Sequence, residues 1–376
     1  MGRKKKAEAG VTSGGTGADR VTLTRIAGEL GVSAMTVSNA YNHPDRLSEA
    51  LRERIFETAG RLGYGGPDPV GRSLRRQRTD VVGILYSSPL SYAFDDPAAV
   101  SFLSGLSSVT EEADLGLLLV SAAGGGPSGG RDARAVAQAA VDGFVIYSMS
   151  DEEPLLVAAL GRRLPAVVVD QPFEEGVPLV GVDDEGAARA AAEHLLDLGH
   201  ERIAIASFGL SADGREGFAE PDRQEQAALR VSRMRLRGYR AALEEAGLSW
   251  SGVPVYECPG SAKEFGHRAA EALFRSKQKP TAILALSDQL ALGAVEWMTE
   301  RRIWVPDDVS VVGFDDVPAA AIADPPLTTI HQDHAGKGIL AGRILVSRLR
   351  EEEPPGAGPL ATHLVVRGST SPPRQR

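Results

Sequence analysis

Short apolar segments alternate with helical stretches from residue 80 to the C-terminus, and this alternation constrains the fold more than any other feature of the chain. A strand–helix rhythm of this kind predicts parallel sheets with helices on both faces. The segment is long for one such unit, so we expect an α/β body of two lobes. The strands are expected at 81–86, 116–121, 143–147, 166–170, 180–183, 202–207, 253–256, 282–286 and 309–314.

Residues 21–66 hold three helical patterns instead of strands. Thr22, Ser33 and Ser48 are suited to the N-cap positions of these helices. The first two helices, joined by a Gly-Val turn at 31–32, have the size and pattern of a helix-turn-helix. That motif places its second helix in the DNA major groove. A plain helical hairpin that packs on the body is the alternative.

The second of these helices carries side chains whose chemistry suits DNA. Asparagine pairs with adenine through two hydrogen bonds, and alanine or methionine contacts the methyl group of thymine. Hydroxyl and amide groups suit phosphates, which position a protein without specifying a sequence. The candidate base contacts are Ala34, Met35 and Asn39. The candidate phosphate contacts are Ser33, Thr36 and Asn42.

Basic charge is concentrated at the start of the chain. Residues 1–79 carry 14 Lys+Arg against 8 Asp+Glu, whereas residues 80–376 carry 27 against 42. A basic head on an acidic body indicates that only the head meets a polyanion. A solvated tail beside an ordinary acidic globule remains the alternative. Within the head we predict a disordered, Gly-rich tail over 1–20 and an arginine-rich linker over 67–79.

The composition excludes several classes of protein. With 43% apolar residues the chain is not a disordered polymer, and no apolar run approaches the roughly 18–20 residues of a membrane helix. The start of the chain lacks the apolar stretch of a secretory signal. A single cysteine, Cys258, excludes a disulfide framework and a multi-thiolate metal site, and the histidines lack metal-ligand spacing. We therefore expect a cytoplasmic protein without metal or cofactor and, lacking a paired catalytic constellation, no enzyme.

The chain resembles the LacI/GalR family of bacterial transcriptional repressors. In residues 21–64 the resemblance is carried by TVSNAYN, LSEALRERI and the closing LGY. In the body it is carried, in the family's order, by HLLDLGHERIAIAS, SDQLALGAVEWM, VPDDVSVVGFDDVPAA, PPLTTIHQD and LVVRGST. It spans all but the two tails. The resemblance implies a small all-α helix-turn-helix headpiece and a two-lobed body like that of periplasmic sugar-binding proteins. It extends the DNA-binding set to Thr22, Leu23 and Tyr64.

The resemblance also assigns a role to the linker. In this family, a segment like 69–74 becomes a short hinge helix only on operator DNA. Leu74 matches the leucine that wedges between the central base pairs in the minor groove, while the arginines that follow meet phosphates. Gly71 stands where the family usually has alanine, which costs a helix about 1 kcal/mol. A Leu74 that simply packs against the body is the alternative.

An effector cleft between the lobes is the second implication. Matched to the family's pocket, the candidate effector residues are Ser88, Asp170, Arg235, Ser287 and Asp315. Each is expected at a strand end, except Arg235, which is expected at a helix start. Carboxylates that accept hydrogen bonds and a guanidinium that donates several favour a sugar or nucleoside-like ligand. In the alternative interpretation, Asp315 and Asp316 form a turn or a salt bridge.

The chain also departs from the family pattern. Ser287 stands where many relatives have asparagine, and no stacking aromatic ring is evident near 258–265. Residues 209–230 are longer and more charged than the usual connection, and the sequence leaves open whether they cover the cleft. We expect one lobe to comprise about 80–200 plus 331–350 and the other about 201–330 plus 351–376.

Together these features predict an effector-controlled, DNA-binding transcriptional regulator, a repressor that acts as a homodimer on double-stranded operator DNA and does not associate with membranes. The alternative from another class is a small-molecule binding protein or a carbohydrate enzyme with a vestigial headpiece.

Overall fold

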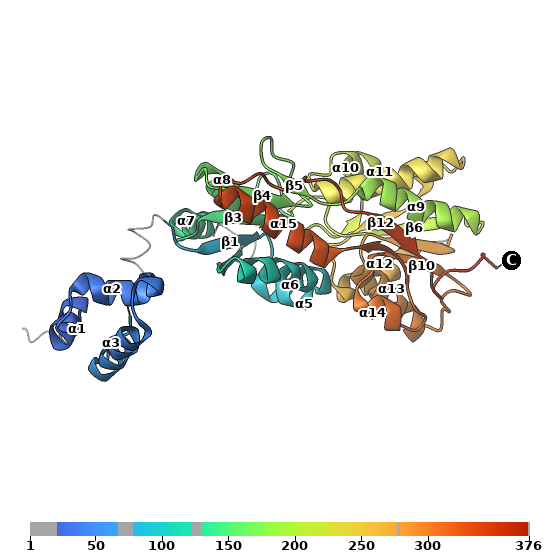
Figure 1. Ribbon diagram of the computed structural model, residues 1–376. Helices are drawn as coiled ribbons and strands as arrows, with labels where there is room; N and C mark the ends of the chain where they lie inside the picture. The colour runs from blue at the N-terminus through green and yellow to red at the C-terminus, as the bar shows by residue number, and fades with distance from the viewer. Residues whose placement is uncertain (1–20, 67–77, 122–128, 277, 375–376) are drawn as a thin grey trace, which may run out of the picture. The chain divides into compact units, whose positions relative to one another are not determined.

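The computed structural model describes residues 21–66, 78–121, 129–276 and 278–374 (Figure 1). The chain divides between Arg78 and Thr79 into two units, a headpiece and a body, which we describe separately. The tail over 1–20 and Leu74 of the linker lie outside the described residues. Every helix in the described ranges is too short or too polar to span a bilayer.

Three α-helices and one short 3-10 turn form the headpiece: α1 (Leu23–Leu30), α2 (Ala34–Asn42), η1 (Pro44–Arg46) and α3 (Glu49–Leu62). Thr22, Ser33 and Ser48 precede the three α-helices as N-cap residues, as predicted, although only Ser33 uses its side chain, accepting a hydrogen bond from the Thr36 amide. The turn between α1 and α2 requires Gly31, whose φ of 68° lies in the left-handed region. The buried core consists of Ile26, Ala27, Val37, Ala40, Ile55 and Ala59.

The first lobe of the body is a five-stranded parallel sheet in the order β2-β1-β3-β4-β5. Its strands are β1 (Val81–Tyr86), β2 (Gly116–Ser121), β3 (Gly143–Tyr147), β4 (Ala166–Val169) and β5 (Leu179–Val180). Its helices are α5 (Leu90–Asp95), α6 (Pro97–Glu112), α7 (Gly129–Gln138), α8 (Pro154–Gly161) and, from much later in the chain, α15 (His334–Leu349). α6 and α15 cover one face, and α7 and α8 cover the other.

The close packing of α6 on α15 depends on glycine. A Cβ at Gly105 would lie 2.0 Å from the carbonyl oxygen of Ala335, and a Cβ at Gly338 would lie 2.1 Å from that of Phe102. Neither distance is sterically possible, so any larger residue at these positions would force the two helices apart.

The second lobe is a seven-stranded sheet in the order β12-β11-β10-β9-β6-β8-β7. Its strands are β6 (Ile203–Ser207), β7 (Gly217–Phe218), β8 (Val255–Glu257), β9 (Ala282–Ala285), β10 (Ser310–Asp315), β11 (Thr328–Gln332) and β12 (Thr362–Val365). The edge strands β7 and β12 are antiparallel to their neighbours. Its helices are α9 (Asp184–Asp197), α10 (Pro221–Glu225), α11 (Arg230–Glu245), η2 (Trp250–Gly252), α12 (Lys263–Leu273), α13 (Asp288–Glu300) and α14 (Pro318–Ile322).

Two parallel-sheet lobes with helices on both faces confirm the predicted fold class, but the expected lobe boundary is wrong. α9 belongs to the second lobe, where it packs on α11 through buried alanines at 187, 188, 191 and 192. The first lobe therefore ends before Asp183, not near residue 200. The chain crosses between the lobes after β5, after β11 and after α15. The first and third crossings lie side by side, because the amide of Leu360 donates to the carbonyl of Gly181 at 2.8 Å.

Candidate DNA-binding face and effector cleft

Helix α2 presents one face to solvent. Val37 and Ala40 are buried in the headpiece core, which fixes the rotation of the helix about its axis. Met35, Asn39 and Asn42 are spaced by four and three residues on the opposite side, and Met35 is 69% exposed. Two candidate base contacts, Met35 and Asn39, therefore share one face with the candidate phosphate contact Asn42, as a recognition helix requires.

Some of the predicted phosphate contacts are engaged within the headpiece. The Ser33 hydroxyl lies 2.8 Å from that of Thr36 and also accepts the Thr36 amide at 3.0 Å. The side-chain amide of Asn42 donates to the carbonyl oxygen of Ser38 at 2.9 Å. A phosphate contact by Ser33 or Asn42 must therefore share or replace these bonds.

Leu23 and Tyr64 lie against the headpiece core. The ring of Tyr64 meets that of Tyr41 edge-on, with centroids 5.9 Å apart. Thr22, in contrast, is exposed, and its side chain makes no capping bond to α1. Of these three residues, Leu23 and Tyr64 have a packing role in the headpiece, while the Thr22 hydroxyl is accessible to a partner.

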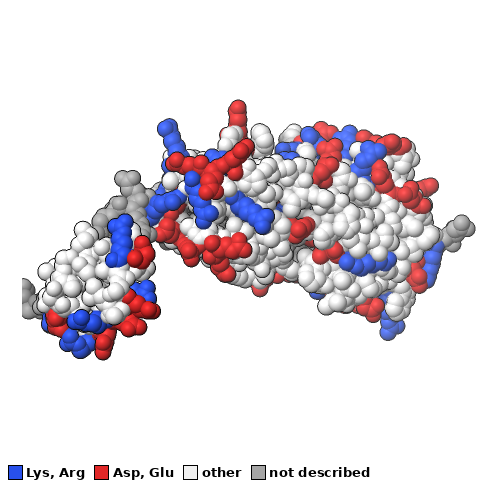
Figure 2. All heavy atoms as spheres, in the orientation of Figure 1, with Lys and Arg blue, Asp and Glu red and all other residues white. Residues whose placement is uncertain are grey.

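The folded headpiece is not basic in itself. Residues 21–66 contain five arginines and five acidic residues, and both signs of charge are visible on it in Figure 2. One arginine, Arg61, is paired with Glu29. The positive excess of the head therefore falls on residues 1–20 and 67–79, which flank the helix-turn-helix.

A cavity of about 610 Å³ lies between the two lobes of the body. This cleft contains all five residues predicted from the sequence. Ser88 and Ser287 follow β1 and β9, Asp170 directly follows β4, and Asp315 ends β10, so these four lie at the carboxyl ends of strands as expected. Arg235 is not at a helix start, because α11 begins at Arg230 and places it in the second turn. Asp170 and Asp315 also have positive φ angles of 62° and 127°, conformations that concentrate at functional sites.

Arg235 is held in place on three sides. Its Nε donates to Asp184 Oδ1 at 2.9 Å, and its Nη1 donates to the carbonyl oxygen of Leu286 at 2.5 Å. The guanidinium carbon lies 3.5 Å from the ring centroid of Phe314. Since the side chain is also buried, it is pre-organised rather than free to follow a ligand.

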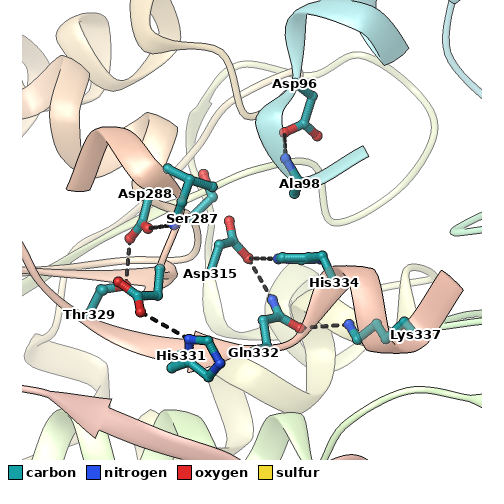
Figure 3. A network of polar contacts seen from close by, with 12 residues as sticks. Asp96, Ala98, Ser287, Asp288, Asp315, Thr329, His331, Gln332, His334 and Lys337 are labelled. Carbon is teal, nitrogen blue, oxygen red and sulfur yellow. Dashed lines mark hydrogen bonds and ion pairs between the residues drawn. The ribbon is translucent and has the colours of Figure 1, made fainter. Parts of the chain in front are cut away.

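Asp315 begins a chain of polar contacts that runs through Gln332 to Lys337 (Figure 3) and continues to Asp170 in the first lobe. Gln332 Nε2 donates to Asp315 Oδ1 at 2.5 Å, and the buried Lys337 donates at 2.6 Å both to Gln332 Oε1 and to Asp170 Oδ1. Burial alone would raise the pKa of Asp315, but His334, Arg235 and Gln332 hold that pKa below its usual value. Asp315 is therefore an ionised acceptor at neutral pH.

The adjacent Asp316 has a different environment. Its carboxylate accepts from Arg367 Nη2 at 2.6 Å and pairs with His331 Nδ1 at 2.9 Å. It is absent from the residues that line the cleft. Asp316 therefore forms the salt bridge of the alternative interpretation, whereas Asp315 faces the cavity. Ser287 also has a structural bond, because its hydroxyl caps α13 by accepting the Leu290 amide at 3.2 Å.

The cleft contains further residues that sequence reasoning missed. They are Tyr86, Asp96, Tyr147, Gln171, Phe208, Gln332 and His334. Tyr86, Tyr147 and Gln332 are the last residues of β1, β3 and β11, so position at a strand end could have indicated them. The aromatic surface therefore comes from strand ends and Phe208, not from the segment near 258–265.

The segment 209–230 covers part of the cleft, which answers the question that the sequence left open. Gly209, Ser211, Ala212, Asp213 and Gly214 line the cavity. Arg223 fastens this insert: its guanidinium donates two hydrogen bonds to Asp213, at 2.8 and 2.9 Å, and two to Glu257, at 3.0 and 2.7 Å.

Glu257 is the partner of Arg223 on strand β8, outside the insert; we call the Asp213–Arg223–Glu257 contacts the clasp. The side chain is fully buried, and its Oε1 also accepts the Leu210 amide at 2.8 Å. Charge-assisted bonds in a buried setting are strong and directional, so the insert is a folded wall of the cleft. Among the described residues, no group of three or more His, Cys, Asp or Glu could hold a metal ion.

A helix-turn-helix unit and a two-lobed α/β body with a polar cleft define a ligand-linked transcriptional regulator. Residues 22–66 match the model for bacterial regulatory proteins of the lacI family, and residues 192–370 match that for a periplasmic binding protein-like domain. An HTH-type transcriptional regulator of Mycolicibacterium smegmatis is 43% identical over 364 residues, covering 94% of this chain and 97% of that one. The chain belongs to the lacI family.

Two solved structures extend the comparison. The lac repressor dimer bound to operator and the anti-inducer ONPF aligns with a TM-score of 0.74 at 26% identity, covering 94% of this chain and 100% of that one. The transcriptional regulator CelR in complex with cellobiose aligns with a TM-score of 0.66 at 29% identity, covering 93% of this chain and 100% of that one. The relative from Mycolicibacterium smegmatis and these two structures are transcriptional regulators, which agrees with the expectation of a regulator rather than an enzyme.

Proposed function

We propose that this protein is a cytoplasmic repressor that binds operator DNA as a homodimer and changes its DNA affinity when a sugar-like effector occupies the cleft. The observation that carries the proposal is the convergence of Ser88, Asp170, Arg235, Ser287 and Asp315, from both lobes, on one cavity. The cavity is of the size of small-molecule sites, about 300–1,000 Å³. The operator complex of the lac repressor and the cellobiose complex of CelR support the two halves of the proposal by similarity.

The polar chain through Lys337 suggests how the cleft senses a ligand. Asp170 belongs to the first lobe and Asp315 to the second, and Lys337 and Gln332 connect them. A ligand that contacts both aspartates binds differently as the angle between the lobes changes. Such differential affinity is what allows a ligand to shift a conformational equilibrium.

DNA recognition is assigned to the exposed face of α2, with Ala34, Met35 and Asn39 toward the bases and Thr22, Ser33, Thr36 and Asn42 toward phosphates. The linker over 67–79, with Leu74 as the minor-groove wedge, would complete the interface. Two headpieces of a dimer would read the two halves of a pseudo-palindrome.

The experiment is a selection of bound sites from random DNA with the full chain, followed by gel shifts at several salt concentrations. We expect one pseudo-palindromic motif and an affinity that falls steeply with salt. Uniform binding to all sequences, or none, would contradict the proposal and favour a small-molecule binding protein with a vestigial headpiece.

A further inference from the structure

A second, smaller pocket lies within the second lobe, between α10, α11 and η2, and we call it the α10–α11 pocket. Its volume is about 350 Å³, within the range of small-molecule sites, about 300–1,000 Å³. No residue lines both this pocket and the effector cleft, among the residues that the structure describes. The α10–α11 pocket is therefore a separate cavity and not an extension of the cleft.

Three arginines of α11 line this pocket. Arg233, Arg237 and Arg240 are spaced by four and three residues, so they lie along one face of the helix. The body as a whole is acidic, with 27 Lys+Arg against 42 Asp+Glu over residues 80–376. The concentration of positive charge at this pocket therefore runs against the composition of the body.

Two of the three guanidinium groups have no carboxylate partner among the described residues. Arg233 donates a hydrogen bond to the backbone carbonyl of Ala227, which does not neutralise its charge. Arg237 is exposed and forms no hydrogen bond or ion pair with the described part of the chain. Both guanidinium groups therefore keep an uncompensated positive charge.

The third arginine connects α11 to α10. Arg240 Nη1 donates to Glu225 Oε1 at 2.8 Å, and Glu225 is the only carboxylate among the described residues that line the pocket. Because Arg240 already neutralises this carboxylate, Glu225 does not cancel the charges of Arg233 and Arg237. The pocket therefore offers two guanidinium groups to an anion.

The floor of the pocket, formed by Leu236 and Trp250, is apolar and fixed. These side chains are 3% and 6% exposed and belong to the core of the second lobe. Trp250 Nε1 donates to Gln224 Oε1 at 2.8 Å, and Gln224 Nε2 donates to the carbonyl oxygen of Ala219 at 2.6 Å. The floor is thus formed before a ligand arrives, and an apolar part of a ligand can lie on it.

The charge of the two uncompensated guanidinium groups favours a phosphate monoester. Such a group carries a charge of about −1.5 to −2 at neutral pH and has three acceptor oxygens. Guanidinium groups bind phosphate through paired, charge-assisted hydrogen bonds. A carboxylate carries a single charge and would leave one guanidinium group uncompensated.

The pocket shares both of its helices with the surroundings of the effector cleft. Arg235, two residues from both Arg233 and Arg237, lies on another side of α11 and lines the cleft. In α10, Gln224 lines the pocket, while the preceding Arg223 forms the clasp that fastens the insert. A ligand that contacts α10 and α11 together would therefore restrain the insert.

We propose that the α10–α11 pocket is a second ligand site, which binds a small organic phosphate monoester and thereby stabilises the insert that forms one wall of the effector cleft. Binding at this site does not depend on the proposed effector control, whereas its influence on the effector response does.

The first experiment measures binding to the full-length protein in the absence of DNA. The probe is phenyl phosphate, which combines a phosphate group with an apolar ring, and the comparison probes are inorganic phosphate, benzoate and phenol. Isothermal titration calorimetry at constant ionic strength gives the affinities. We expect phenyl phosphate to bind most tightly.

Each other outcome overturns a stated part of the proposal. An equal affinity for benzoate would overturn the phosphate class, and an equal affinity for inorganic phosphate would overturn the role of the apolar floor. The absence of binding at about 10 mM phenyl phosphate, far above the concentration at which a specific site fills, would overturn the site itself.

Three variants show where the probe binds. Arg233→Ala and Arg237→Ala should each weaken phenyl phosphate binding by about fivefold to twentyfold, because charge-assisted hydrogen bonds are lost. Arg237→Ala removes no bond within the described structure, so its melting temperature should not change. Arg302→Ala removes an exposed arginine of the same lobe that does not line the pocket, and it should leave the affinity unchanged. Equal affinities of all three variants and the unsubstituted protein would overturn the assignment to this pocket.

The second experiment measures the influence on the insert. Limited proteolysis within 209–230 is compared with and without saturating phenyl phosphate. We expect slower cleavage with the probe, and no protection in Arg237→Ala at the same probe concentration. Unchanged cleavage of protein that binds the probe would overturn the link to the cleft wall and leave the site standing. Neither experiment involves DNA or a ligand of the cleft, so a failure here is distinct from a failure of the proposed repressor function.

Discussion

At the scale of single residues, the surroundings of each carboxylate decide what it does. Asp315 and Asp316 are neighbours in sequence, yet one faces the effector cleft and the other is tied to Arg367 and His331. Asp96 caps α6 by accepting the Ala98 amide at 3.0 Å, and it holds its proton more tightly than an exposed aspartate does. The surroundings of two carboxylates, Asp96 and Asp184, have measurable consequences.

The first consequence concerns pH. The pKa of Asp96, about 6 in the fold, lies above its ordinary value of 3.8, so the folded state binds this proton more tightly than the unfolded state. The resulting contribution to stability is present below pH 4 and is lost as pH rises through 6, for a total of about 3 kcal/mol. Asp96→Asn preserves the cap without a charge.

We therefore expect the melting temperature of Asp96→Asn, relative to the unsubstituted protein, to increase between pH 5 and pH 8. Thermal unfolding of ligand-free protein across this range measures the difference. A difference that does not vary with pH would show that Asp96 keeps an ordinary pKa.

The second consequence concerns Arg235. Its removal leaves the buried Asp184 with only the longer ion pair to Arg230, at 3.9 Å, and breaking one partner of a buried pair costs about 3–5 kcal/mol. Arg235→Ala should lower the melting temperature strongly, whereas Arg240→Ala, which breaks exposed pairs with Glu225 and Glu244, should cost less than about 1 kcal/mol. Equal melting temperatures for the two variants would refute the buried-pair interpretation. Asp315→Asn is thus the better variant for testing the effector response.

At the scale of elements, the insert is a distinct unit with its own fastening. Arg223→Ala removes the clasp between Asp213 and the buried Glu257 and should free the cleft wall at 209–214. We expect faster proteolysis within 209–230 and a weakened effector response, with DNA binding in the absence of effector retained. Arg215→Ala, an exposed change in the same insert, is the control. Unchanged proteolysis in Arg223→Ala would mean that the other contacts of the insert, such as the Leu210–Glu257 bond and the strand pair β7–β8, are enough to hold it.

Helix α2 carries the prediction for DNA sequence preference. Met35 and Asn39 lie on its accessible face, and loss of a specific base contact typically costs about 1–3 kcal/mol. Met35→Ala and Asn39→Ala should each change the selected motif at one symmetric pair of positions, measured by selection from random DNA. Identical motifs for both variants and the unsubstituted protein would remove these residues from the base contacts.

The elements also show where sequence reasoning works. The central strands were predictable because both faces are covered, which produces continuous apolar runs such as Val81–Tyr86. β7 has only two residues, and β11 mixes threonine, histidine and glutamine, so neither presents such a run. The last strand, Thr362–Val365, was not among the expected strands. α9 was assigned to the wrong lobe because a helix pattern does not reveal which sheet it covers.

The residues of the cleft also divide into those that the sequence could predict and those that it could not. Residues at strand ends were within reach of the sequence, since a parallel sheet gathers the carboxyl ends of its strands at one edge. Asp96 and His334 could not be predicted from the sequence. Asp96 precedes helix α6, and His334 begins helix α15, which is distant in sequence from the rest of the first lobe. Their convergence depends on the tertiary path.

At the scale of the whole molecule, the distribution of charge leads to the last prediction. The helix-turn-helix is balanced in charge, and the basic excess lies in the segments on either side of it. Each phosphate contact contributes about 0.9 to the slope of log K against log salt. Replacing Lys4, Lys5 and Lys6 by alanine should lower that slope by up to about 2.7, with the preferred DNA motif unchanged.

The control removes three exposed charges from the body, Lys279, Arg302 and Arg374, and should leave the slope as it is. Gel shifts at four or more salt concentrations measure both. An unaltered slope in the lysine variant would assign the electrostatic contacts to the headpiece or to the linker.

The path of the chain between the lobes sets the kind of motion that an effector can cause. Three covalent connections join the lobes, and two of them are hydrogen-bonded side by side at Gly181 and Leu360. We expect these two paired connections to resist separation and sliding of the lobes but to allow the lobes to bend relative to each other. We therefore expect ligand binding in the cleft to change mainly the angle between the lobes, so that each lobe stays folded and attached while their relative orientation carries the signal.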